Sequence, residues 1–177
     1  MAPTRQLVAA FTLAAIPFVA AAQNLSIGLG AEPSSLDPHY HNLSPNNMLA
    51  RHVFEALVGQ DVNQKPRPGL AESWRTTDPL TWEFKLRKGV KFSDGAPFDS
   101  AAVKFSFERA KDAKSTNKAK GAVFNNITHI STPDAHTVVL VLTNPDGNFL
   151  FRMGENTAVI LHPDSAANAA TKPVGTG

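Results

Sequence analysis

The sequence predicts a mixed α/β fold (α+β) in which helices and strands alternate and some strands form hairpins. The segment "TWEFKL" alternates apolar and polar residues, with the period of two that is typical of a half-buried strand. Residues 44–59 instead repeat apolar residues at helical spacing. Residues 127–142 resemble two strands joined by a turn that contains proline. Together these patterns favour interleaved elements over an all-helical or an all-β fold.

Residues 1–22 are predicted to be a secretory signal peptide. The opening carries one cation, Arg5, followed by an uncharged apolar stretch over residues 7–19 and then by small residues. This stretch is shorter than the roughly 20 apolar residues that span a bilayer, and Pro17 interrupts it. We therefore expect cleavage near Gln23.

Residues 23–177 have a length that suits one domain with its own core. The sequence has no cysteine, which excludes disulfides, thiolate metal sites and a lipid-modified cysteine anchor, so we expect a free periplasmic protein. Loss of Arg5 leaves 16 Lys and Arg residues against 15 Asp and Glu, a balance that argues against nucleic acid as a partner. No later segment has the length and apolarity of a membrane span, so no stable membrane insertion is expected.

The first predicted elements are a strand and a helix. Leu25, Ile27 and Leu29 alternate with small residues, as in a strand. After a loop, Ser44 is placed as a helix N-cap with Pro45 at the first helical position, and the apolar spacing continues to Gly59.

The central elements follow from the same patterns. In the strand that begins at "TWEFKL", the apolar face carries Trp82, Phe84 and Leu86. A helix is predicted over residues 100–110, capped by Asp99 or Ser100. Its buried side is expected to carry Val103, Phe107 and Ala110.

The last third is predicted to begin with an exposed, lysine-rich loop over residues 111–121. The elements expected after it are strands at residues 127–131 and 137–142 with a type I turn at 132–135, a short helix at 149–153 and a strand at 158–161. The second strand, "TVVLVL", is apolar enough to be covered on both faces.

One alternative is a metal site at Asp37, His39 and His41, whose spacing can place side chains on one face of an extended segment. A fourth ligand is not evident nearby, and His52 has no spacing that would recruit it. The test of this hypothesis is whether His39 and His41 converge with a further ligand-type side chain.

Catalytic and cofactor motifs are absent from the sequence. It has no G-x-S-x-G, no cysteine nucleophile and no H-E-x-x-H, and His52 and Glu55 are best interpreted as the exposed side of a helix. "GLGAEPS" has proline where a dinucleotide-binding motif needs a helix to begin. The sequence therefore predicts no enzyme and no cofactor, with a periplasmic metal-dependent hydrolase kept as the rival class.

Several segments together resemble the extracellular solute-binding proteins, family 5, which serve ABC importers of peptides, oligopeptides and nickel. The similarity lies in "DPHYHN", "HVFEALV", "PGLAESW", "TWEFKLRKGVKFSDGAPFDSAAVKFSFERA" and "PVGTG", in that order along the chain. It implies a two-lobed binding protein of the Venus-flytrap type (class II), of which residues 23–177 form part of the N-terminal lobe.

The resemblance also implies a function. A small-molecule or peptide ligand is captured between two lobes that close by a hinge, and is then delivered to the permease subunits of the transporter. A metal-chelate or haem receptor of the same family is the variant that would use His39 and His41.

The same resemblance places the loop before the first long helix in the wall of the binding cleft. The ligand-lining candidates that it implies are Tyr40, His41, Asn42, Ser44, Asn46 and Met48. Aromatic and polar groups of this kind suit a cleft for a polar solute, although helix capping alone would also explain Ser44. Glu32 and Asp37 are weaker candidates.

Other parts of the matched segments are expected to be structural. The aromatic residues expected in the core are Trp74, Trp82, Phe84, Phe92 and Phe105, and Asp94 and Gly95 are expected to form a turn.

The chain departs from the family mainly at its end, because relatives are about three times longer and continue past "PVGTG" into a second lobe. We therefore expect a fragment of the family's domain, with weak or no ligand binding by itself and with exposed strand edges that favour aggregation.

Overall fold

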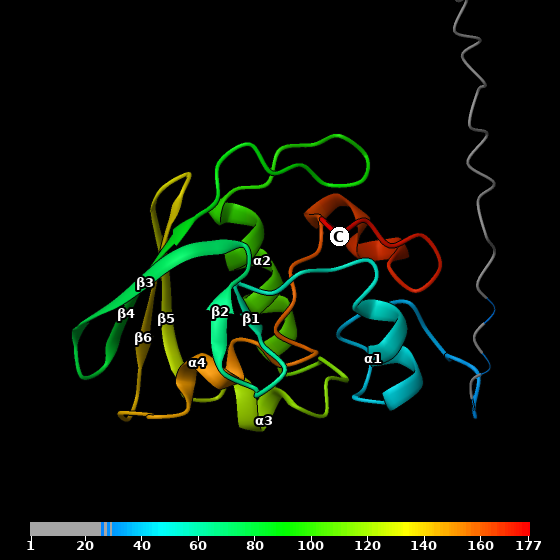
Figure 1. The fold of residues 1–177 in the computed structure, drawn as a ribbon, viewed down its shortest axis with the longest axis horizontal. Helices are drawn as coiled ribbons and strands as arrows, with labels where there is room; N and C mark the ends of the chain where they lie inside the picture. The colour runs from blue at the N-terminus through cyan, green and yellow to red at the C-terminus, as the bar shows by residue number, and fades with distance from the viewer. Residues whose placement is uncertain (1–25, 27, 29) are drawn as a thin grey trace, which may run out of the picture.

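The computed structural model describes residues 26, 28 and 30–177 (Figure 1). The predicted signal peptide and the apolar residues of the first predicted strand lie outside the described residues. The elements are α1 (Ser44–Ala50), β1 (Val58–Gln60), β2 (Pro66–Pro68), β3 (Ala71–Asp78), β4 (Thr81–Leu86), α2 (Ser100–Lys111), α3 (Lys120–Val123), β5 (Ile127–Asp134), β6 (Thr137–Leu142), α4 (Phe149–Arg152) and the 3₁₀ helix η1 (Pro163–Asn168). The mixed α/β prediction is confirmed.

A four-stranded antiparallel sheet has the order β3-β4-β6-β5. The strand predicted from "TWEFKL" is β4, in which Phe84 and Leu86 are buried and Lys85 is exposed. Its central position explains this pattern, because one face of the sheet is covered and the other meets water. In β6, Val139 and Val141 are only partly buried, so the prediction of full cover on both faces is wrong.

Helix α2 lies against β5 and β6 of this sheet. The Asp99 carboxylate caps the helix by accepting hydrogen bonds from the backbone N–H groups of Ala101 and Ala102, at 2.9 and 3.2 Å. Val103, Phe107 and Ala110 are fully buried on the sheet side. The predicted helix, its cap and its buried face are all confirmed.

The opposite side of α2 packs against a second, smaller apolar cluster, which has Phe54, Val159 and Leu161 at its centre and Phe105 beside them. Figure 1 shows α1 and the C-terminal segment on the side of α2 that faces away from the four-stranded sheet. The Leu161 N–H donates to the Ser106 hydroxyl at 3.1 Å. Helix α2 therefore joins two differently built halves of the molecule.

The prediction of one helix from Ser44 to Gly59 is wrong, because α1 ends at Ala50. The later apolar residues are buried, but their backbone pairs with other segments: the N–H groups of Leu70 and Ala71 donate to the carbonyls of Ala56 and Leu57 at 2.9 Å each. Residues Val58–Gln60 form β1, which pairs with β2. Tertiary pairing thus overrides the helical spacing. Ser44 is also not the N-cap: Leu43 occupies that position, without a side-chain hydrogen bond.

Two predictions for the last third of the chain are wrong. β5 extends through the expected turn to Asp134, which pairs with Thr137, so the two-residue turn is Ala135–His136. Residues 158–161 are buried but do not form a strand, and Val159 makes only an isolated bridge to Ala56. The short helix predicted at 149–153 is confirmed as α4.

The lysine-rich segment is more ordered than the predicted exposed loop. The Lys120 ammonium donates to the carbonyls of Asp112, Ala113 and Ser115 at 3.2, 3.1 and 3.2 Å. Lys111 donates to the carbonyl of Ile127 at 2.6 Å. The three donors of the Lys120 ammonium close the segment onto the end of α2, and Lys111 ties that end to the first residue of β5.

Among the expected core aromatics, Phe84 and Phe92 are buried, whereas Trp74, Trp82 and Phe105 are partly buried against the apolar clusters. The turn at Asp94–Gly95 is confirmed: the Asp94 carboxylate accepts from the Ala96 N–H at 3.0 Å, and Gly95 has a φ of 91°. Among the described residues, no helix has the length and apolarity needed to cross a bilayer.

Candidate functional site

The residues that precede α1, here called the 31–43 loop, contain no helix or strand. Backbone hydrogen bonds fix the loop at separate points: Leu36 donates to the Ala170 carbonyl and Tyr40 to the Asp37 carbonyl, each at 3.1 Å. The Ser34 N–H donates to the Asn46 amide oxygen at 2.9 Å. Contacts with distant segments, and not secondary structure, therefore determine the shape of this loop.

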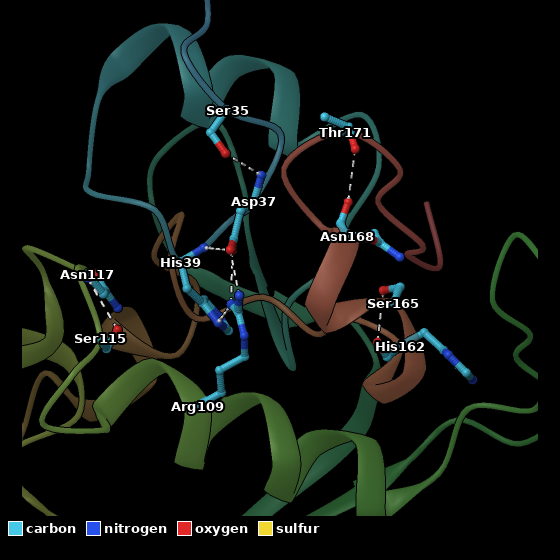
Figure 2. Close-up of polar contacts among 10 residues, drawn as sticks. All are labelled: Ser35, Asp37, His39, Arg109, Ser115, Asn117, His162, Ser165, Asn168 and Thr171. Atoms are coloured by element: carbon cyan, nitrogen blue, oxygen red, sulfur yellow. Dashed lines mark hydrogen bonds and ion pairs between the residues drawn. The ribbon is translucent and has the colours of Figure 1, made fainter.

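Arg109 of α2 contacts two residues of the loop with its side chain (Figure 2). Its guanidinium donates to both Asp37 carboxylate oxygens, at 2.9 and 2.5 Å. The nitrogen Nη1 also lies 3.0 Å from Nδ1 of His39. Figure 2 shows Asp37 and His39 converging from the loop onto the arginine, which rises from the helix below them. A bidentate arginine–carboxylate pair combines charge with a fixed planar geometry.

This arrangement determines the charge state of the three groups. Arginine has no acceptor, so Nδ1 of His39 must accept, and the imidazole is the neutral tautomer with its proton on Nε2. Burial and the neighbouring guanidinium lower the pKa of His39 to about 4, against a weaker opposing effect of Asp37 and of the Val159 backbone. Burial opposes ionisation of Asp37, but hydrogen bonds from Arg109 and from the His39 amide outweigh it and lower the pKa of that carboxyl.

Nε2 of His39 has no hydrogen bond of normal geometry among the described residues. The His39 side chain therefore depends on Arg109 for its one well-formed side-chain contact.

Four of the predicted ligand-lining residues are at the surface. Tyr40 is 37% exposed and Met48 52% exposed, and Asn42 and Ser44 are exposed as well. The Asn42 amide oxygen accepts from the Asn47 amide at 2.7 Å. These side chains are accessible to a ligand, and their binding role stays a prediction.

The other two predicted residues are positioned differently. Asn46 is buried and its amide exchanges hydrogen bonds with Ser34, so its side chain supports the loop from within. His41 has a φ of 58°, in the left-handed region, and its ring lies edge-on to that of Tyr40 with the ring centroids 4.2 Å apart. This conformation costs a non-glycine residue on the order of 1–2 kcal/mol.

Two hollows flank the loop. The smaller, of about 260 Å³, brings Ser44 and Met48 together with Asn47, Arg51 and Asn156. Arg51 donates to the amide oxygen of Asn156 and so ties α1 to the segment that follows α4. The larger hollow, of about 520 Å³, has Asp37, His39 and Arg109 on one side and Ser115 and Thr116 on the other. Both are open depressions on the surface.

The proposed metal ligands do not converge on a common point. Asp37 and His39 are both bonded to the Arg109 cation, and His41 packs beside Tyr40. Within residues 26, 28 and 30–177, no group of three or more His, Asp or Glu side chains is arranged to hold a metal ion. A guanidinium also disfavours a cation at the same place.

The two residues considered for hydrolytic chemistry, His52 and Glu55, are in different environments. His52 is exposed in the turn after α1, and Glu55 pairs with Arg87 at 3.1 Å. The expected exposed helical side does not exist at these positions, because α1 has already ended.

Sequence reasoning missed Arg109 and Asn156. Arg109 lies 72 residues from Asp37, and Asn156 lies 105 residues from Arg51. No local pattern connects residues so far apart. The available signal was that Arg109 occupies the side of α2 opposite the predicted buried face, close to Phe105.

Residues 65–177 match the family described as "Bacterial extracellular solute-binding proteins, family 5 Middle". The chain belongs to this family. Among curated proteins, it is 32% identical over 162 residues to the glutathione-binding protein GsiB of Escherichia coli O6:K15:H31, an alignment that covers 89% of this chain and 31% of the relative. The chain thus spans about a third of the length of the curated relatives that it matches.

Solved structures of the family have the same fold in this region. The periplasmic binding protein DppA of Helicobacter pylori, in complex with peptide STSA, is 31% identical with a TM-score of 0.75, over 84% of this chain and 34% of that chain. AgaA of A. tumefaciens R10, in complex with agropinic acid, is 31% identical with a TM-score of 0.75, over 82% of this chain and 30% of that chain. These relatives are binding proteins and not enzymes, and the fold is part of a class II periplasmic binding protein.

Proposed function

We propose that this family 5 chain contributes to the substrate-binding component of an ABC importer, which captures a peptide-like or small organic solute in the periplasm. The observation that carries this proposal is the family 5 match over residues 65–177. The solute is held between two lobes and transferred to the permease subunits. Relatives that bind glutathione, a tetrapeptide and an opine define the range of solutes to test.

The surface beside the 31–43 loop is the part of this chain that we assign to the solute. Tyr40, Asn42, Ser44 and Met48 present an aromatic ring, polar groups and a thioether to solvent on one short segment. An aromatic ring supplies stacking area, while amide and hydroxyl groups donate to and accept from a polar solute. The left-handed conformation of His41 supports the assignment, because backbone strain is common where a loop is shaped for binding.

Ser44 is a stronger candidate in the structure than in the sequence. Helix capping was its alternative explanation, and Leu43 holds the capping position instead. Asn46 contributes indirectly, because its buried amide holds Ser34. We therefore assign direct contact to the four exposed residues and to His41, and a supporting role to Asn46.

The test is a calorimetric titration of the full-length gene product with glutathione, the tetrapeptide STSA and agropinic acid. We expect one probe to bind, and Tyr40→Ala to weaken that probe about tenfold, since an aromatic contact contributes roughly 0.5–1.5 kcal/mol beyond its buried area. Phe151→Ala is the matched control, because Phe151 is 36% exposed and Tyr40 37%. Failure of all three probes would reject the proposed range of solutes, and equal loss in both variants would reject the assigned surface.

A further inference from the structure

The 31–43 loop has to hold its shape without secondary structure. From Leu36 to Tyr40 every backbone N–H donates a hydrogen bond, but only that of Leu36 reaches a distant segment, at the Ala170 carbonyl; the others close turns within the loop. A loop of this kind samples several conformations unless long-range contacts select one, and each unselected conformation reduces the fraction of protein that is ready to bind.

Arg109 supplies such a contact next to the assigned surface. Its guanidinium binds the carboxylate of Asp37 and the imidazole of His39, and His39 directly precedes Tyr40. Asp37 in turn accepts from the His39 N–H at 2.9 Å, and its carbonyl accepts from Tyr40 at 3.1 Å. One arginine on a rigid helix therefore determines the direction in which the chain enters the ligand-facing residues.

We propose that Arg109 is a positioning residue of the solute site: by holding Asp37 and His39, it presents Tyr40 and the residues after it in their binding arrangement before the solute arrives. This inference rests on the proposed function. It assigns a role in affinity to a residue that need not touch the solute. In the population-shift relation, the apparent Kd rises as the fraction of binding-competent protein falls.

The charged groups around His39 give this role a specific signature. Asp37 and Arg109 face it directly, and Glu108, Asp112 and Lys114 line the same hollow from the end of α2 and the segment after it. The Arg109 cation is one of the causes that keep His39 neutral. Replacement of Arg109 by glutamine removes this repulsion and leaves Asp37 beside the imidazole, so the pKa of His39 rises from about 4.

The direction of the pH effect follows. In the wild type, His39 stays neutral between about pH 5 and 8, so its charge contributes no change in solute affinity over this range. In Arg109→Gln, His39 is neutral at the upper end of this pH range. The loop then has no cation to pair with Asp37, so binding of the solute is weak. As the pH falls, protonated His39 pairs with Asp37 and replaces part of the lost contact. The affinity of the variant relative to that of the wild type therefore increases on acidification.

The experiment titrates glutathione, the tetrapeptide STSA and agropinic acid into full-length wild type, Arg109→Gln and Arg109→Lys at several pH values between about 5 and 8. Arg75→Gln is the matched control: it breaks an arginine–carboxylate pair of similar length, Arg75–Glu83 at 3.0 Å, on the exposed strand β3. We expect Arg109→Gln to weaken binding about tenfold or more near pH 8, with partial recovery toward pH 5. Arg109→Lys keeps the charge and should restore part of the affinity, with the same pH profile as the wild type.

The outcomes separate the two proposals. If the wild type binds none of the probes, the proposed function fails and the inference fails with it. If the wild type binds and Arg109→Gln binds equally well, or binds weakly with the same pH dependence as the wild type, the positioning role is rejected while the proposed function stands. Thermal unfolding of each variant shows whether Arg109→Gln is folded. If Arg109→Gln is not folded, the affinity of Arg109→Lys for the solute tests the positioning role in its place.

Discussion

Helix α2 separates two regions that are held together in different ways. On its sheet side, Val103 and Phe107 pack against a continuous apolar core in which many side chains are fully buried. On its other side, the apolar cluster is small, and individual polar contacts such as Asp37–Arg109 and Ser106–Leu161 hold the irregular segments. The periodic spacing of apolar residues along the chain specifies the first region. A few contacts between residues far apart in the sequence specify the second.

The difference explains why the candidate site lies in the second region. A periodic apolar core tolerates many sequences of similar volume and fixes no surface group in particular. A loop that is held by charged and hydrogen-bonded contacts can point specific side chains outward, at the cost of lower local stability. The 31–43 loop has this character, and the sheet gives it a rigid support through α2.

The largest expected effect tests the first region. Phe107→Ala removes a side chain that is 0% exposed and that packs edge-on against Phe124, with the ring centroids 5.3 Å apart. We expect a loss of about 3–5 kcal/mol in the free energy of unfolding, because the cavity would lie in the apolar core between α2 and the sheet, where the surroundings relax only partially. Urea denaturation measures the change, and Phe151→Ala, at the surface, should change stability by far less. Similar losses in both variants would show that the core is not as tightly packed as the structure indicates.

The accuracy of the sequence predictions follows the same division. Helix α2, its cap at Asp99, strand β4 and the hairpin of β5 and β6 were predictable because local periodicity and capping chemistry agree with the tertiary structure there. The helix predicted through residues 51–59 was wrong because its apolar spacing is satisfied by burial in a turn and in β1, where long-range pairing decides the backbone. Spacing alone cannot distinguish these outcomes.

The site was predictable only in part. The resemblance to a family proposed the segment from Tyr40 to Met48 as ligand-lining; the structure leaves most of it exposed, and its binding role stays a prediction. Neither spacing nor composition could show that Asn46 turns inward or that Arg109 reaches Asp37 across 72 positions. Such contacts depend on how α2 and the loop approach each other in space. The residues around each position in the sequence do not reveal that approach.

The second prediction tests the irregular region. Gly175 lies so close to the Val53 carbonyl that an added Cβ would be 1.9 Å from its oxygen, and the Gly175 carbonyl accepts from the Ser93 N–H at 2.8 Å. Gly175→Ala should therefore destabilise by about 1–3 kcal/mol, as overpacking does. We expect the effect to be local, with faster hydrogen exchange at the Ser93 amide and unchanged exchange in β4 and β6.

Gly147→Ala is the control for this variant, because a Cβ added at Gly147 would meet no atom within 4 Å and the backbone there is not left-handed. If Gly175→Ala instead accelerated exchange throughout the sheet, the two regions would unfold as one unit, and the division at α2 would be wrong.

The smallest effect returns to α2 itself, the element that both regions share. Asp99→Ala removes the carboxylate that accepts from the N–H groups of Ala101 and Ala102, and loss of such a cap costs about 1 kcal/mol. Asp99→Ser keeps a capping oxygen and should lose only a small part of this. Because Arg109 lies near the opposite end of α2, fraying of the first turn should leave the Asp37 contact intact, and solute affinity should not change. A fall in affinity in Asp99→Ala would mean that the whole helix, and not Arg109 alone, determines the position of the loop.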